Sequence, residues 1–210
     1  MKVEKIIIRI VLLTIYFMWQ LILPAQYYGR NSEESWRKSR DENVKPEILL
    51  NKLSIKPGMI IGEAGAGAGY LTYYLAKRVA EKGHIYANDI LALPLENLKK
   101  YLNNAGIENY TTVLGQDEDP LFPVKNLDMI VMLHAYHEFN SKVRWLINSK
   151  KYIKPDGAIV ILDSRDDDGR EITRREVETE AGKAGYNLSY FEEYNKIIKI
   201  FILKPIVKSK

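Results

Sequence analysis

The sequence predicts an α/β protein with a doubly wound, Rossmann-like, mostly parallel seven-stranded sheet that has one antiparallel strand at a C-terminal hairpin. Strand and helix patterns alternate five times along the chain, which is typical of such sheets. The stretch "LDMIVMLHAY" is a continuous apolar run of the kind found in parallel strands covered on both faces. The last two strand patterns are separated only by a short turn near Tyr194 and Asn195, and such a short link makes an antiparallel hairpin.

Hydrophobic spacing and turn residues define the expected elements in order. Pro46 suits the first turn of a short helix, and a glycine-rich turn after the first strand leads into a second helix that ends at Gly83. Thr173 and Glu176 form a capping box at the start of the last helix, which ends at Gly185. The expected strands are residues 59–63, 84–89, 110–115, 127–136 and 157–164, and the remaining expected helices are residues 94–104 and 141–153.

Composition excludes several classes of function. The chain has 210 residues, which most simply form one domain, and its lack of cysteine excludes disulfides, thiolate catalysis and cysteine metal sites. Only three histidines are present, so we expect no multi-histidine metal centre. The net charge of +4 includes +2 from residues 1–26, and the remaining +2 is too small for a nucleic-acid-binding surface. We therefore expect no nucleic-acid partner.

The N-terminal stretch "MKVEKIIIRIVLLTIYFMWQLILPAQ" resembles an export signal. It has a basic start, an apolar run and a small residue, Ala25, after which cleavage is plausible. The alternative is an uncleaved membrane anchor over residues 6–23, close to the lower limit of about 17–25 residues for a spanning helix. We expect an exported or periplasmic, or a membrane-anchored, protein. Basic residues on both sides of the run leave the side of the membrane undecided. The expected divisions are a leader or anchor over 1–26, a polar linker over 27–45 and a domain over 46–210.

The stretch "IGEAGAGAGY" predicts a ligand-binding turn. It places Gly65, Gly67 and Gly69 on alternate positions at the end of the first expected strand, where the backbone can approach a ligand and a helix N-terminus adds free N–H groups. A dinucleotide motif, G-x-G-x-x-G or A, would need a small residue where the two possible frames have Tyr70 or Thr72. A P-loop would need G-K-S/T after the glycines, and the chain has none there.

The E-x-G-x-G-x-G pattern that begins at Glu63 resembles that of the class I S-adenosylmethionine-dependent methyltransferases. The resemblance of the chain to this family extends from about Trp36 to Leu203. A closer resemblance is to uncharacterised, signal-bearing members with a D-x-Y-H-E element after the fourth strand. The resemblance implies S-adenosylmethionine as the cofactor, with its methionine amino and carboxyl groups held by Glu63 and the glycine turn.

Four further residues fit the adenosine part of this cofactor. Asp89 lies 20 residues past Gly69, at the end of the second strand, where a carboxylate accepts hydrogen bonds from ribose hydroxyls in nicotinamide and S-adenosylmethionine proteins alike. Ile90 would pack on the adenine. By the resemblance, Gln116 and Asp117 would lie near the adenine amino group. The alternative is that the acidic residues 117–119 form a solvated turn without a ligand.

The "HAYHEF" element supplies the candidate catalytic residues, which are Tyr136, His137 and Glu138. Methyl transfer is an in-line displacement that depends first on position, and it needs a base only if the acceptor keeps its proton. His137 could take that proton from a hydroxyl or amine, with Glu138 orienting the imidazole. The alternative is that these residues only start the next helix. The resemblance implies that the residue at position 134 contacts the methionine end of the cofactor. The family has Asp or Asn at this position, whereas this chain has His134.

The sequence therefore predicts a methyltransferase that acts on a small-molecule or lipid-like acceptor, with possible membrane association through residues 6–23. An alternative is a non-catalytic S-adenosylmethionine-binding module at the cell envelope. A less favoured alternative is an NAD-dependent oxidoreductase, because Tyr70 would obstruct the pyrophosphate turn.

Overall fold

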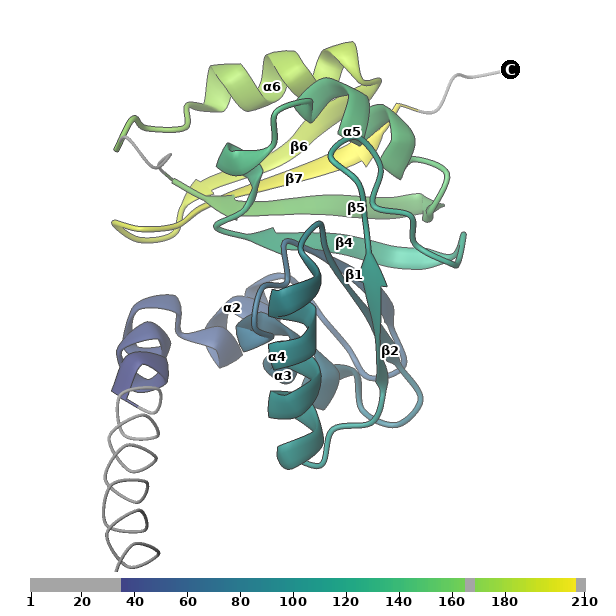
Figure 1. The fold of residues 1–210 in the computed structure, drawn as a ribbon. Helices are drawn as coiled ribbons and strands as arrows, with labels where there is room; N and C mark the ends of the chain where they lie inside the picture. The colour runs from purple at the N-terminus through teal and green to yellow at the C-terminus, as the bar shows by residue number, and fades with distance from the viewer. Residues whose placement is uncertain (1–34, 165–168, 207–210) are drawn as a thin grey trace, which may run out of the picture. The chain divides into compact units, whose positions relative to one another are not determined.

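A seven-stranded sheet with the strand order β3-β2-β1-β4-β5-β7-β6 forms the centre of the fold in a computed structural model that describes residues 35–164 and 169–206 (Figure 1). Strands β1 to β5 pair in parallel, and β7 runs antiparallel to both β5 and β6. This arrangement confirms the predicted fold class. The strands are β1 Ile60–Ala64, β2 His84–Asp89, β3 Tyr110–Leu114, β4 Leu127–Leu133, β5 Ile153–Asp163, β6 Tyr186–Glu193 and β7 Lys199–Pro205.

Helices cover both faces of this sheet. Along β2, Tyr86 packs with the core cluster that contains residues of α5 and α6, whereas Ala87 packs with Leu98 of α4. Because neighbouring residues of a strand point to opposite faces, α4 lies on the face opposite to α5 and α6. The helices are α2 Pro46–Lys52, α3 Tyr70–Val79, α4 Ala92–Asn104, α5 Lys142–Ser149 and α6 Arg174–Lys183, and a short 3-10 helix, η1, covers Tyr136–Glu138.

The chain divides into two units, Met1–Lys45 and Pro46–Lys210. In the first unit, residues 35–44 are helical. The expected leader over 1–26 and the first part of the expected linker lie outside the described residues. Within 35–164 and 169–206, no helix has the length and apolar character needed to cross a membrane.

Several predicted boundaries are wrong. The helix after the glycine-rich turn ends at Val79 instead of at Gly83, and the fifth strand begins at Ile153 instead of residue 157. The fourth strand ends at Leu133 instead of residue 136, because His134 has a left-handed φ of 51°, which lies outside the extended region of a β-strand. The helix expected to reach residue 153 ends at Ser149, and the chain from Ile153 already belongs to β5, where Ile153 pairs with Leu127 before a register shift.

The last helix begins as predicted. The hydroxyl of Thr173 accepts a hydrogen bond from the backbone N–H of Glu176, and the Glu176 carboxylate accepts one from the backbone N–H of Thr173, at 3.2 and 2.9 Å. Gly185 follows the helix with a φ of 75°, a conformation that favours glycine. The capping box and the glycine stop are therefore confirmed.

Candidate functional site

The glycine-rich turn connects β1 to α3 and has left-handed backbone at each of its glycines. The φ angles of Gly65, Gly67 and Gly69 are 71°, 53° and 86°. A Cβ atom on Gly65 would lie 2.4 Å from the Cβ of Ala135, so only glycine allows this turn to pack against the end of β4. A Cβ atom on Gly67 would meet nothing within 4 Å. The turn is thus closely packed at Gly65 and open at Gly67.

Asp89 joins the ends of β1 and β2. Its Oδ2 accepts a hydrogen bond from the backbone N–H of Gly67 at 2.9 Å, and its Oδ1 accepts one from the backbone N–H of Leu91 at 3.0 Å. Glu63 lies deeper, with only 2% of its surface exposed, and its Oε2 accepts a 2.6 Å hydrogen bond from the hydroxyl of Thr72 on α3. Glu63 therefore ties β1 to the helix after the turn.

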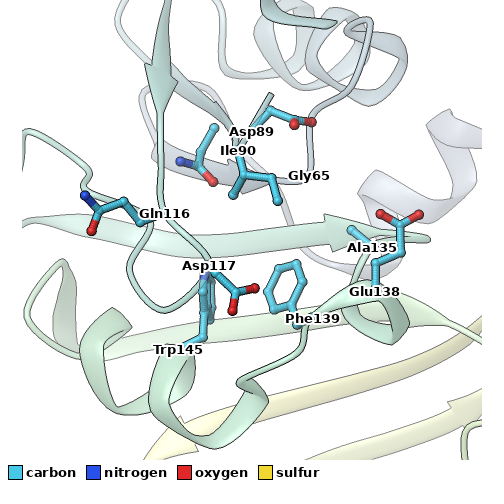
Figure 2. Close-up of a pocket in the computed structure, with 10 residues that line it drawn as sticks. Gly65, Asp89, Ile90, Gln116, Asp117, Ala135, Glu138, Phe139 and Trp145 are labelled. Atoms are coloured by element: carbon cyan, nitrogen blue, oxygen red, sulfur yellow. The ribbon is translucent and has the colours of Figure 1, made fainter. Parts of the chain in front are cut away.

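A pocket opens at the carboxyl ends of β1, β2 and β4 (Figure 2). Six of the residues that line it are among those predicted from the sequence, namely Gly65, Asp89, Ile90, Gln116, Asp117 and Glu138. The other four lining residues are Asn88, Ala135, Phe139 and Trp145. Six predicted residues do not line it, namely Glu63, Gly67, Gly69, His134, Tyr136 and His137.

The lining of the pocket combines apolar and acidic side chains. Figure 2 shows Asp89 and Ile90 on one side of it and Asp117, Phe139 and Trp145 on the other. The rings of Phe139 and Trp145 are in contact, with centroids 5.1 Å apart, and Ile90 lines the pocket although 55% of its surface is exposed. None of the ten described lining residues is basic. Such a site suits a ligand with a flat apolar ring and positive charge.

Asn88 and Trp145 were not predicted because their place in the pocket depends on tertiary structure. The side-chain amide of Asn88 donates hydrogen bonds to the carbonyl oxygens of Val113 and Pro120, and this fixes the loop after β3 against β2. Trp145 comes from α5, a helix that contributes to the pocket only after it folds back along the sheet.

A cluster of two histidines and one aspartate lies at the ends of β4 and β5. Asp163 is fully buried, and its Oδ2 lies 2.9 Å from Nδ1 of His137 and accepts a 3.2 Å hydrogen bond from the backbone N–H of that residue. Its Oδ1 accepts a hydrogen bond from the backbone N–H of Ser164 and lies 3.7 Å from Nδ1 of His134. No group of acidic or histidine side chains in the described part of the chain is arranged to hold a metal ion.

The charge of Asp163 follows from these contacts. Burial alone raises the pKa of its carboxyl group, but the neighbouring rings of His134 and His137 and the backbone N–H of His137 outweigh burial and hold the pKa below the ordinary value of 3.8. Asp163 is therefore ionised at neutral pH and can only accept hydrogen bonds. The sequence offered a signal for this residue, since a buried strand that ends in an acid is the same pattern that identified Asp89.

The structure separates the residues of the "HAYHEF" element. The hydroxyl of Tyr136 is buried and donates a 2.6 Å hydrogen bond to Glu180 on α6, and burial together with this bond raises the pKa of Tyr136. Glu138 lines the pocket, and its Oε1 lies 3.7 Å from Nε2 of His137. Asp163, rather than Glu138, makes the short contact to the His137 ring.

A family model described as a methyltransferase domain matches residues 55–200. The chain belongs to this family. A solved relative, described as a SAM-dependent methyltransferase from Aquifex aeolicus, is 27% identical and superposes with a TM-score of 0.73, covering 79% of this chain and 92% of that one. A TehB-like SAM-dependent methyltransferase from Corynebacterium glutamicum shares the fold at 17% identity and a TM-score of 0.64, covering 84% of this chain and 97% of that one.

Two curated relatives match over shorter segments. A protein-L-isoaspartate O-methyltransferase of Pyrococcus horikoshii is 27% identical over 114 residues, which are 54% of this chain and 48% of the relative. A ubiquinone/menaquinone biosynthesis C-methyltransferase of Vibrio vulnificus is 28% identical over 109 residues, which are 51% and 42% of the two chains. The match thus spans about half the length of these relatives or less. The methyltransferase family and its cofactor, S-adenosylmethionine, are confirmed as predicted from the sequence.

The residues of the pocket fit this cofactor. The open backbone at Gly67 leaves room for a ligand against the turn, and the acidic lining suits the positively charged sulfonium and ammonium groups. Ile90, Phe139 and Trp145 provide apolar surface for an adenine ring.

Proposed function

We propose that the chain transfers a methyl group from S-adenosylmethionine to a small-molecule or lipophilic acceptor, with the pocket at the ends of β1, β2 and β4 as the cofactor site. The observation that carries this proposal is that Gly65, Asp89, Ile90 and Asp117, which lie at or after the ends of three different strands, line one pocket. Ligands of open α/β sheets bind outside the carboxyl ends of the strands, which is where this pocket lies.

Each part of the cofactor has a residue suited to hold it. Asp89 would accept hydrogen bonds from the ribose hydroxyls, Ile90 would pack on the adenine, and Gln116 and Asp117 would lie near its amino group. The glycine turn would face the methionine end of the cofactor. Glu63 would stabilise this turn through its hydrogen bond with the hydroxyl of Thr72 on α3. His134 would lie near the same end of the ligand. When bound, S-adenosylmethionine supplies an electrophilic methyl group on a positively charged sulfur.

The acceptor would approach from the side of Glu138 and His137. Glu138 lines the pocket, and His137 follows the end of β4 with its Nε2 toward the Glu138 carboxylate. A histidine at this position can remove a proton from an acceptor and thereby raise the nucleophilicity of the reacting atom.

Two observations favour a lipophilic acceptor. Ile90, which lines the pocket, is 55% exposed, and Leu91 and Leu93 at the start of α4 are 59% and 66% exposed; exposed apolar side chains in one segment suit contact with an apolar partner. An uncleaved anchor over residues 6–23, one of the two alternatives for the N-terminal stretch, would bring the domain to a membrane. One matched relative is named for ubiquinone/menaquinone biosynthesis, which is an example of a lipophilic product in a related protein.

A turnover assay tests this proposal. The full-length protein is incubated with S-adenosylmethionine labelled in its methyl group, together with a panel of phenols, hydroquinones, carboxylic acids and extracted lipids. We expect label in at least one acceptor and a loss of transfer in Asp89→Asn, but not in the control Asp128→Asn. Asp128 lies at the opposite end of β4, where it accepts a hydrogen bond from the backbone N–H of Ile60. Cofactor binding without transfer to any acceptor would contradict the enzymatic proposal and favour the non-catalytic binding module.

A further inference from the structure

We propose that Asp163 is a positioning residue that holds His137 in the tautomer with its proton on Nδ1, so that Nε2 accepts the proton of the methyl acceptor. The role of Nε2 as a base rests on the function proposed above, whereas the tautomer is a property of the protein alone. The acceptor is then a hydroxyl or amine that binds with its proton still in place.

The position of the carboxylate carries this inference. Asp163 ends β5, is fully buried, and directs Oδ2 at both Nδ1 and the backbone N–H of His137, at 2.9 and 3.2 Å. Contact with the ring and with the backbone of the same residue fixes the orientation of the imidazole as well as its distance. The backbone N–H of Ser164 in turn holds the second oxygen at 3.0 Å, so the carboxylate cannot rotate freely.

The tautomer follows from what each atom can donate. An ionised carboxylate has no proton to give, and so the 2.9 Å contact requires a proton on Nδ1. A neutral imidazole carries one N–H, which leaves the lone pair on Nε2. Nε2 is the nitrogen on the side of Glu138, and Glu138 lines the pocket. The lone pair is therefore directed toward the side from which we expect the acceptor.

The resulting proton transfer balances in atoms and charge. The lone pair of the acceptor forms the bond to the methyl carbon, the electron pair of the broken carbon–sulfur bond stays on sulfur, and the acceptor proton moves to Nε2 of His137. The imidazolium is stabilised by the adjacent negative charge of Asp163, and it loses its proton to solvent before the next reaction.

His134 shares the carboxylate but has a different geometry. Its Nδ1 is 3.7 Å from Oδ1 of Asp163, beyond the range of a direct hydrogen bond, and its φ of 51° turns the chain at the end of β4. The short ring contact of Asp163 is the one to His137, which is why we assign the positioning role to that pair.

Nitrogen NMR of the histidine rings tests the tautomer without cofactor or acceptor. Long-range ¹H–¹⁵N spectra of the full-length, ¹⁵N-labelled protein distinguish protonated from unprotonated ring nitrogens. The chain has only three histidines, so the variants His84→Gln, His134→Gln and His137→Gln assign the signals. Asp163→Asn removes the charge, and Asp128→Asn is the matched control because Asp128 also accepts a backbone N–H bond but lies at the other end of β4.

We expect neutral His137 to carry its proton on Nδ1 in the wild type and in Asp128→Asn, and to move toward the Nε2–H tautomer in Asp163→Asn. A wild-type ring with its proton on Nε2 would overturn the proposal, and this reading does not depend on whether Asp163→Asn folds. An unchanged tautomer in a folded Asp163→Asn protein would overturn it as well. Calorimetric titration of S-adenosylmethionine into the same samples tests the cofactor site separately, so failure of the proposed function is distinguishable from failure of this inference.

With an acceptor in hand, Asp163→Asn is expected to lower kcat by about 10²–10⁴-fold, the usual contribution of general base catalysis, with little change in the KM for S-adenosylmethionine. An equal rise in KM with unchanged kcat would mean that Asp163 serves binding rather than proton transfer, and it would contradict the proposal.

Discussion

Gly65 and Gly67 lie two residues apart and contribute to the pocket in different ways. Both have a left-handed φ, but a Cβ atom would clash only at Gly65, which packs against Ala135 after β4, whereas at Gly67 it would meet nothing within 4 Å. The glycine run was recognised from the sequence because of its spacing. The separate roles of its members depend on where Ala135 lies, which the spacing does not reveal.

Gly65→Ala is expected to lower the free energy of unfolding by about 2–4 kcal/mol, because a left-handed alanine costs about 1–2 kcal/mol and the contact with Ala135 adds a cost of overpacking. Gly58→Ala is the matched control, since Gly58 has a φ of 84° but a Cβ there would meet nothing within 4 Å. Urea unfolding of the two variants measures the difference. Equal losses would show that the close approach to Ala135 carries no cost.

Asp163 connects stability to pH. Its pKa is lower in the folded protein than its ordinary value of 3.8, so the folded state binds fewer protons in this range than the unfolded state does. The stabilisation is fully present above the unfolded pKa and is lost as the pH falls through the folded pKa. We expect the free energy of unfolding to fall below about pH 4, and to fall less steeply in Asp163→Asn. Urea unfolding between pH 6 and pH 3 measures both slopes, and identical slopes would contradict this assignment.

At the scale of elements, the sequence predicted the cap of α6 better than the ends of β4 and α5. The capping box of α6 depends on residues three apart and is independent of the rest of the fold. The end of β4 depends on the left-handed backbone of His134. The residues before and after His134 are apolar, so the sequence does not indicate that the strand ends there. The end of α5 was missed because the apolar residues around Ile153 suit a helix and a strand equally well.

Thr173→Ala is expected to lower the free energy of unfolding by about 0.5–2 kcal/mol, since it removes the hydroxyl that caps α6. Thr179→Ala in the same helix is the control, because the Thr179 hydroxyl bonds only to the backbone carbonyl of Arg175 and alanine has the higher helix propensity. Urea unfolding should separate the two variants. An equal loss in both would mean that the cap contributes nothing beyond helix propensity.

At the scale of the whole molecule, the fold class followed from the alternation of strands and helices and from the short last turn, which are local patterns. That Asp89, Gln116 and Asp117 line one pocket followed too, because they lie at or just after strand ends, and parallel strands bring their carboxyl ends to the same side of the sheet. The aromatic wall of Phe139 and Trp145 and the contact between His137 and Asp163 could not be predicted, since they depend on how α5 and the loop after β4 fold back over the sheet.

The measurement that tests the central claim most directly is calorimetric titration of S-adenosylmethionine and of NAD into the wild type, Asp89→Ala and the control Asp128→Ala. Loss of a carboxylate that bonds to the ribose should cost about 1.5–3 kcal/mol, or roughly tenfold or more in affinity. We expect the wild type and Asp128→Ala to bind S-adenosylmethionine alike and not NAD, and Asp89→Ala to bind it at least tenfold more weakly. Equal binding in all three proteins, or no binding in the wild type, would contradict the assignment of this pocket as the cofactor site.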